Sequence, residues 1–178
     1  RSKVTYGAPC RPYYRRFDPE YVARRPTAIT CPSGRMVVPN GFQSILKKGA
    51  RVRESGEVSH SFREESYDAR ELDEISSSVK CYRGPDADPR WRDVNPEHYY
   101  DLCTVYADTS RVVRKLKKGP KGTYYTLDFD VILLCGQTEL EAQIRWMENA
   151  SSGLVLQWNF EFAFTTRFTS YLQGAEKR

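Results

Sequence analysis

Apolar and polar side chains alternate along the stretch from Gly122 to Trp146, and this pattern predicts the centre of the fold. A period of two residues is typical of a β-strand with one buried face. In the first half of the stretch the apolar residues at this period are Tyr125, Leu127, Phe129, Val131 and Leu133. The residues between them fall on the other face, where we expect them to meet water: Thr126, Asp128 and Asp130.

Two further alternating runs follow this strand after short connections. Cys135 to Thr138 has the composition of a hairpin connection, and the alternation resumes from Leu140 to Trp146. After a turn-like segment at 148–153, the run from Leu154 to Phe164 alternates again. Three such runs with short connections predict an antiparallel meander as the core sheet.

Shorter strand candidates precede the meander, separated by turns rich in glycine, proline and serine such as Pro32–Gly34. The clearest helical signal is at residues 19–23, where Asp18 can cap the helix and Pro19 occupies its first position. By spacing alone the chain is an antiparallel sandwich or barrel of about eight or nine short strands. We expect one domain over residues 1–178, with an irregular insertion at 10–28 and a tail at 165–178.

Composition supports a packed core. The chain has 178 residues with eight Phe, twelve Tyr and three Trp, whereas disordered chains are poor in aromatic residues. No apolar run approaches the length of a membrane span. Because the chain opens on Arg1 and not on Met, we expect a fragment or a processed product.

The cysteines argue against a metal site. Five cysteines are widely spaced, no CxxC pair occurs, and only His60 and His98 could join them. We interpret most of them as reduced core thiols, which predicts a cytoplasmic protein. We expect neither a metal nor any other cofactor.

The sequence also argues against an enzyme. It contains no GxSxG, GxxxxGK, GxGxxG or HExxH motif. Asp128 and Asp130 could suggest paired carboxylates, but a solvated strand face explains them better. A cysteine-dependent enzyme remains an alternative, and it would require a thiol with a lowered pKa. We therefore predict a non-catalytic protein.

The formal net charge of +5 is unevenly placed. Residues 111–122 hold six basic residues and no acidic one, and the insertion interleaves arginines with aromatic residues. One interpretation is nucleic-acid binding by phosphate contact and stacking; the other is a solvated loop and an insertion packed on the sheet. The candidate nucleic-acid residues are Arg11, Arg15, Arg16, Arg24, Arg25, Arg114, Lys115, Lys117 and Lys118.

Several short segments, taken in order, resemble a known family. Arg1–Gly7 (RSKVTYG) is similar to the junction that follows the ATPase domain in divergent, fungal-type relatives of the 70-kDa heat-shock proteins. Further segments match in the right order up to about Phe164: FQSILKKGARV at 42–52, SHSF at 59–62, VKCYRG at 79–84 and GTYYTLDFDV at 122–131.

The resemblance implies the substrate-binding domain of these chaperones, a β-sandwich that holds extended apolar polypeptide in a groove. By order, the groove residues correspond to Ala8, Phe62, Ser77 and Val79. The family's ATPase domain and long helical lid have no counterpart in these 178 residues, and the insertion replaces a short loop.

We therefore expect an all-β fold, an antiparallel β-sandwich of about eight strands with long loops and at most one or two short helices. The predicted function is non-catalytic binding of an extended polypeptide or protein partner. If the full protein has an ATPase domain upstream, this would be its client- or partner-facing half. The alternative is a basic β-domain that binds nucleic acid.

Overall fold

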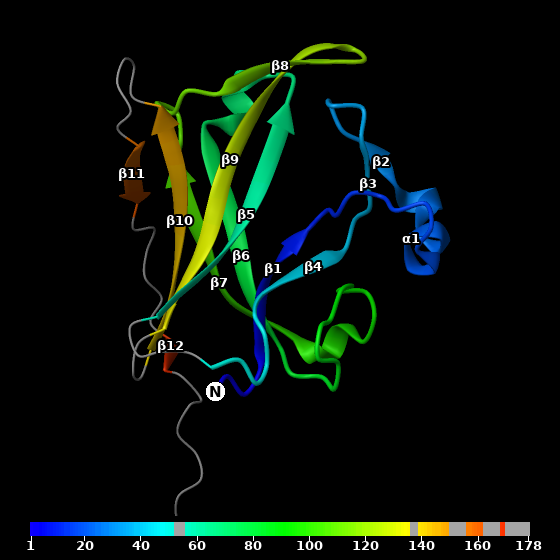
Figure 1. Ribbon diagram of the computed structural model, residues 1–178, viewed down its shortest axis with the longest axis vertical. Coiled ribbons are helices and arrows are strands. Elements are labelled where there is room, and N and C mark those ends of the chain that lie inside the picture. Colours follow the sequence, from blue (N-terminus) through cyan, green and yellow to red (C-terminus); the bar gives the residue numbers. More distant parts are fainter. Residues whose placement is uncertain (52–55, 136–138, 150–155, 162–167, 170–178) are drawn as a thin grey trace, which may run out of the picture.

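The computed structural model describes residues 1–51, 56–135, 139–149, 156–161 and 168–169. Antiparallel strands form two main sheets that pack face to face, and helix is confined to short segments (Figure 1). This arrangement confirms the predicted all-β, sandwich-like fold.

The first sheet has four strands in the order β4-β1-β6-β7. The second has six strands, with the path β11-β10-β9-β5, and with β8 paired to β9 and β12 paired to β10. The strand bounds are β1 Thr5–Cys10, β4 Gly41–Leu46, β5 Gly56–Ser66, β6 Glu74–Tyr82, β7 Tyr99–Asp108, β8 Lys115–Gly119, β9 Gly122–Cys135, β10 Glu139–Asn149, β11 Leu156–Glu161 and β12 Phe168–Thr169.

The predicted meander is present as β9, β10 and β11, paired antiparallel in chain order. Side chains on its inward face belong to the core cluster, among them Leu127, Val131, Leu133 and Ile144. Facing strands supply the rest of that cluster, including Val79 of β6 and Val105 of β7. The alternation read from the sequence therefore orients the sheet correctly. The end of the third run, at 162–164, lies outside the described residues.

One expectation about β9 is wrong. Thr126 is 1% exposed and does not meet water, whereas Asp128 and Asp130 on the same face are half-buried. The cross-strand neighbour of Thr126 is Glu65, whose carboxylate accepts a hydrogen bond from the Ser33 N–H at 3.1 Å. The Pro32–Gly34 turn between Thr30 and Met36 therefore lies over this end of the sheet and removes water from Thr126.

The insertion is more ordered than the predicted irregular segment. It contains α1 (Pro19–Ala23), where Asp18 accepts a hydrogen bond from the Glu20 N–H as the sequence predicts. The 3-10 helix η1 (Arg25–Thr27) follows, and then the predicted hairpin of β2 (Ile29–Thr30) and β3 (Met36–Val37). Two further 3-10 helices are η2 (Ala69–Leu72) and η3 (Pro96–His98). In the described part of the chain, no helix is long and apolar enough to span a membrane.

Candidate functional site

The strand β5 is an edge of the six-stranded sheet. Residues Gly56–Ser66 all pair with β9 on one side, and no strand in the described residues pairs with the other side. In Figure 1 this other side of β5 is the one away from β9, towards β4. An unpaired edge presents a row of backbone N–H and C=O groups that a further strand can use.

The inward side chains of β5 are only half-buried. They alternate with exposed outward residues along the strand, and the inward set is Val58, His60, Phe62 and Glu64. Val58 and Phe62 pack against the core cluster, but each side chain stays partly exposed. The free edge therefore combines open backbone groups with accessible apolar side chains.

Phe62 is the largest apolar side chain among the inward residues of this edge. Its ring stacks on Phe129 of β9 with centroids 5.9 Å apart and an interplanar angle of 25°. His60 meets the Phe62 ring edge-on at 5.1 Å. These contacts fix the orientation of Phe62 from one side while part of its surface stays accessible.

Two titratable side chains flank Phe62. Burial lowers the pKa of His60, and the nearby Asp130 carboxylate opposes that shift. Burial raises the pKa of Glu64, and the Arg11 guanidinium opposes that shift from 3.4 Å. The edge is thus a partly desolvated environment, in which apolar contacts and hydrogen bonds are stronger than in bulk water.

The other residues of the expected groove lie deeper. Ala8 of β1 is 0% exposed and Val79 of β6 is 1% exposed, while Ser77 of β6 is half-buried. Val79 belongs to the core cluster on which Phe62 packs. Phe62 is therefore at the accessible rim, and a ligand would reach Ala8 or Val79 only if the two sheets separated.

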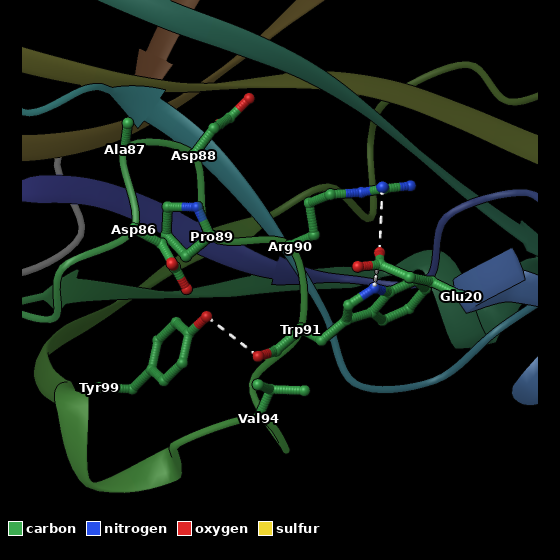
Figure 2. A pocket seen from close by; sticks show the side chains of 9 residues that line it. All are labelled: Glu20, Asp86, Ala87, Asp88, Pro89, Arg90, Trp91, Val94 and Tyr99. Atoms are coloured by element: carbon green, nitrogen blue, oxygen red, sulfur yellow. Dashed lines mark hydrogen bonds and ion pairs between the residues drawn. The ribbon is translucent and has the colours of Figure 1, made fainter. Parts of the chain in front are cut away.

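A pocket of about 340 Å³ lies where α1 meets the loop before β7. Figure 2 shows Glu20, Arg90 and Trp91 linked on one side of it and Tyr99 on the other. Trp91 Nε1 donates to Glu20 Oε2 at 2.7 Å, and Arg90 Nη1 lies 3.0 Å from the same oxygen. The Tyr99 hydroxyl donates to the Trp91 carbonyl oxygen at 3.0 Å.

These contacts hold the insertion against the body of the protein. The Trp91 ring also meets Tyr21 edge-on at 5.0 Å and carries the Arg24 guanidinium at 4.2 Å. The polar groups of the pocket are largely engaged with one another, and Asp88 points away from Tyr99 (Figure 2) towards its ion pair with Lys47 at 2.8 Å. We interpret the pocket as an anchor for the insertion.

Four of the nine predicted nucleic-acid residues are engaged in the fold. Arg24 pairs with Asp93 at 2.6 Å, Arg11 with Glu64, and Lys115 with Asp128 at 3.3 Å. Arg114 pairs with Asp73 and donates to the carbonyl oxygens of Ser110 and Val112, each at 3.2 Å.

The remaining five make no ion pair with a described residue: Arg15, Arg16, Arg25, Lys117 and Lys118. They do not form one group. The three arginines lie beside α1, where Arg16 covers the exposed ring of Phe17 at 4.5 Å. The two lysines lie on β8, which is a strand and not the predicted loop.

Sequence reasoning left Arg35 out of the candidate site, and it considered Tyr13 and Lys121 only as parts of the insertion and of the basic run at 111–122. Arg35 stacks on the Tyr13 ring at 4.4 Å, and Lys121 lies in the turn that joins β8 to β9. The turn signals at Pro32–Gly34 and Gly119–Gly122 could be read from the sequence, but nothing in it shows that the two turns meet.

Four of the five cysteines are disfavoured as reactive thiols, and the described residues offer no metal cluster. Burial raises the pKa of Cys10 to about 11 and also raises the pKa values of Cys31, Cys103 and Cys135. A raised pKa disfavours the nucleophilic thiolate. All five cysteines are free, and no group of three or more described His, Cys, Asp or Glu residues could hold a metal ion.

Comparisons with protein-family models, with curated proteins and with solved structures find no match for this chain. The function therefore has to be argued from the site itself.

Proposed function

We propose that this β-sandwich is a non-catalytic polypeptide-binding domain that holds an extended segment along the free edge of β5. The observation that carries the proposal is the unpaired edge of β5 beside its half-buried inward side chains. The resemblance of the chain to the substrate-binding domain of 70-kDa heat-shock-type chaperones supports the same kind of ligand.

A polypeptide can bind such an edge by adding a strand to the sheet. Main-chain hydrogen bonds then supply affinity, and every second side chain of the ligand points to the same side as Val58 and Phe62. Apolar ligand side chains fit this role because Phe62 and Val58 are apolar and partly desolvated. In a longer protein with an ATPase domain, this would be the half that faces the client.

Binding to short peptides rich in Leu, Ile and Phe tests the proposal. We expect Phe62→Ala to weaken binding roughly tenfold or more, because truncating a central aromatic anchor commonly costs over 1 kcal/mol. Phe62→Leu keeps an apolar side chain and should retain most of the affinity. Tyr106→Ala is the matched control, because it removes an aromatic side chain, 51% exposed, from β7 in the other sheet.

Backbone methylation of the peptide tests strand addition directly. Alternate residues of a strand point their N–H groups to the same side. Methylating one alternate set of peptide nitrogens should therefore abolish binding, while methylating the other set should leave it intact. Equal binding of both methylated peptides, or full binding by the Phe62→Ala protein, would overturn the proposal.

A further inference from the structure

Two hairpin turns that are far apart in the sequence meet in the structure. The first is the Pro32–Gly34 turn between β2 and β3, and the second is the Gly119–Gly122 turn between β8 and β9. A β-carbon added at Gly34 would lie 2.6 Å from Pro120, and one added at Gly119 would overlap the Pro32 carbonyl oxygen. In Figure 1 the tip of the β2–β3 hairpin lies beside the loop that follows β8. The two hairpins are therefore in close contact.

This contact gathers cationic side chains from both hairpins. We call the surface formed by Tyr13, Arg35, Lys117 and Lys121 the joint surface. Lys118 is not part of it, because neighbouring residues of a strand point to opposite faces, and Gly119, which shares the face of Lys117, is the residue whose added β-carbon would meet Pro32. The three cations of the joint surface make no ion pair with a described residue. Lys117 is half-buried, and the other two are exposed. Three cations without a carboxylate partner make this a positively charged surface.

The carboxylates near the joint surface are already engaged. Glu65 accepts the hydrogen bond from the Ser33 N–H, and Glu64 pairs with Arg11. On the outward face of β9, Asp128 accepts hydrogen bonds from Arg63 of β5 at 2.5 and 3.1 Å and pairs with Lys115. These acidic groups are matched by cations or N–H donors of their own.

An aromatic ring belongs to the same surface. Tyr13 is 41% exposed, and its backbone bridges to Val37 of β3. Its side chain also lies near the Arg63 guanidinium of β5, which places it over the junction of the hairpins with the sheet. Arg35 stacked on this ring presents a planar cation beside an aromatic face. Such a pair can stack with a nucleobase and contact its phosphate.

We propose that the joint surface binds single-stranded nucleic acid. Lysines and Arg35 contact the phosphates, and the Tyr13–Arg35 pair stacks on one unpaired base. This activity goes beyond polypeptide binding at β5 and uses none of the inward residues of that strand. Of the nine candidate cations from the sequence it keeps Lys117, and it adds Tyr13, Arg35 and Lys121, which the fold brings close to it.

Fluorescence anisotropy with labelled 20-nucleotide oligo(dT), oligo(rU) and a blunt duplex of the same length tests the proposal. We expect binding to the single strands to weaken as salt rises, with a slope of log K against log salt of about −0.7 per phosphate contacted. Reversing two charges together, Arg35→Glu and Lys121→Glu, should lower the affinity roughly tenfold or more and flatten that slope. Both side chains are exposed, so the variant should remain folded.

Two further variants test the proposal. One asks whether base stacking contributes to binding apart from charge, and the other asks whether binding depends on the joint surface and not on positive charge elsewhere. Tyr13→Ala should weaken single-strand binding about fivefold or more, with the salt slope unchanged, because it removes stacking and no charge. Lys48→Glu is the matched control, since Lys48 is exposed and follows β4, near the end of β5 opposite the joint surface.

The proposal is overturned if no oligonucleotide binds at low salt, if the duplex binds as tightly as the single strands, or if Lys48→Glu weakens binding as much as the Arg35→Glu, Lys121→Glu double variant. Peptide binding by these variants is measured in parallel. Loss of one activity with retention of the other distinguishes failure of this proposal from failure of the proposed function.

Discussion

His60 points inward from β5, where desolvation disfavours its charged form and lowers its pKa. In the unfolded chain a histidine titrates near pH 6.5. As the pH falls below that value, the unfolded chain takes up a proton that the folded protein resists, so the free energy of unfolding decreases until the pH passes the lower folded pKa. The Asp130 carboxylate raises the pKa of His60, but by less than desolvation lowers it.

We therefore expect His60→Gln to make the free energy of unfolding less dependent on pH below about pH 6.5. Urea unfolding at pH 7, 6 and 5 measures this dependence for the wild type and the variant. The wild type should lose stability towards pH 5 and the variant should lose less. Equal losses in both proteins would show that His60 is not desolvated in the folded state.

Arg114 illustrates a candidate cation that the fold engages in an ion pair. It lies in the basic run that suggests nucleic-acid binding, yet its side chain is 13% exposed and pairs with Asp73. Removing it leaves two carbonyl oxygens and one carboxylate without their donor.

We expect Arg114→Ala to lower the free energy of unfolding by about 2 kcal/mol, because hydrogen bonds to charged groups are worth about 1.5–3 kcal/mol and Asp73 is partly solvated. The salt slope for oligonucleotide binding should stay the same at a temperature where the variant is folded. Chemical denaturation and anisotropy titrations check the two parts. If Arg114→Ala kept the wild-type free energy of unfolding and gave a flatter salt slope, Arg114 would have to be part of the nucleic-acid-binding surface.

At the scale of elements, the contact between the two hairpins depends on glycine. Gly119 has no room for a side chain because its position faces the Pro32 carbonyl oxygen and the Tyr124 ring. Gly119→Ala must push the hairpins apart, and we expect it to destabilise the protein and to weaken oligonucleotide binding.

Gly49→Ala is a control for backbone effects, since an added methyl there meets no atom within 4 Å while φ is +82°. Gly49→Ala should lower the free energy of unfolding by only about 1 kcal/mol, the usual penalty for an alanine in the left-handed conformation. Thermal unfolding and anisotropy with both variants check this prediction. Equal behaviour of the two variants would mean that the hairpin contact does not matter.

Elements with a strong periodic signal are the ones that sequence predicts. β9 and β10 alternate over long runs, and α1 begins at its predicted cap and proline. The strand β8 escapes prediction because its sequence, KLKKG, is basic and has no buried face of its own. It becomes a strand because the Gly119–Gly122 turn folds it back onto β9.

At the scale of the whole molecule, stability depends on one core between the two sheets. Leu133 of β9 is 0% exposed in that core. Leu133→Ala should lower the free energy of unfolding by about 2–5 kcal/mol, through lost burial and the cavity left behind. Leu116→Ala is the matched control, because Leu116 is 61% exposed on β8. Urea denaturation of both variants measures the difference, and similar losses would contradict the described core.

The sequence by itself determines the local structure of this protein and the side of each long strand that faces the core. The alternation at period two, the turn residues and the helix start with its cap and first-position proline are local signals. Each of them acts through short-range sterics or through the burial of one strand face. They are enough to predict an all-β fold, either a sandwich or a barrel, with the meander at its centre.

Tertiary structure alone decides which residues are accessible together. It buries Ala8 and Val79 while leaving Phe62 at the rim of β5, and it engages four of the nine candidate cations in ion pairs. It also brings Arg35 next to the β8–β9 turn. These outcomes depend on contacts between segments far apart in the chain, and a one-dimensional pattern carries no information about such contacts.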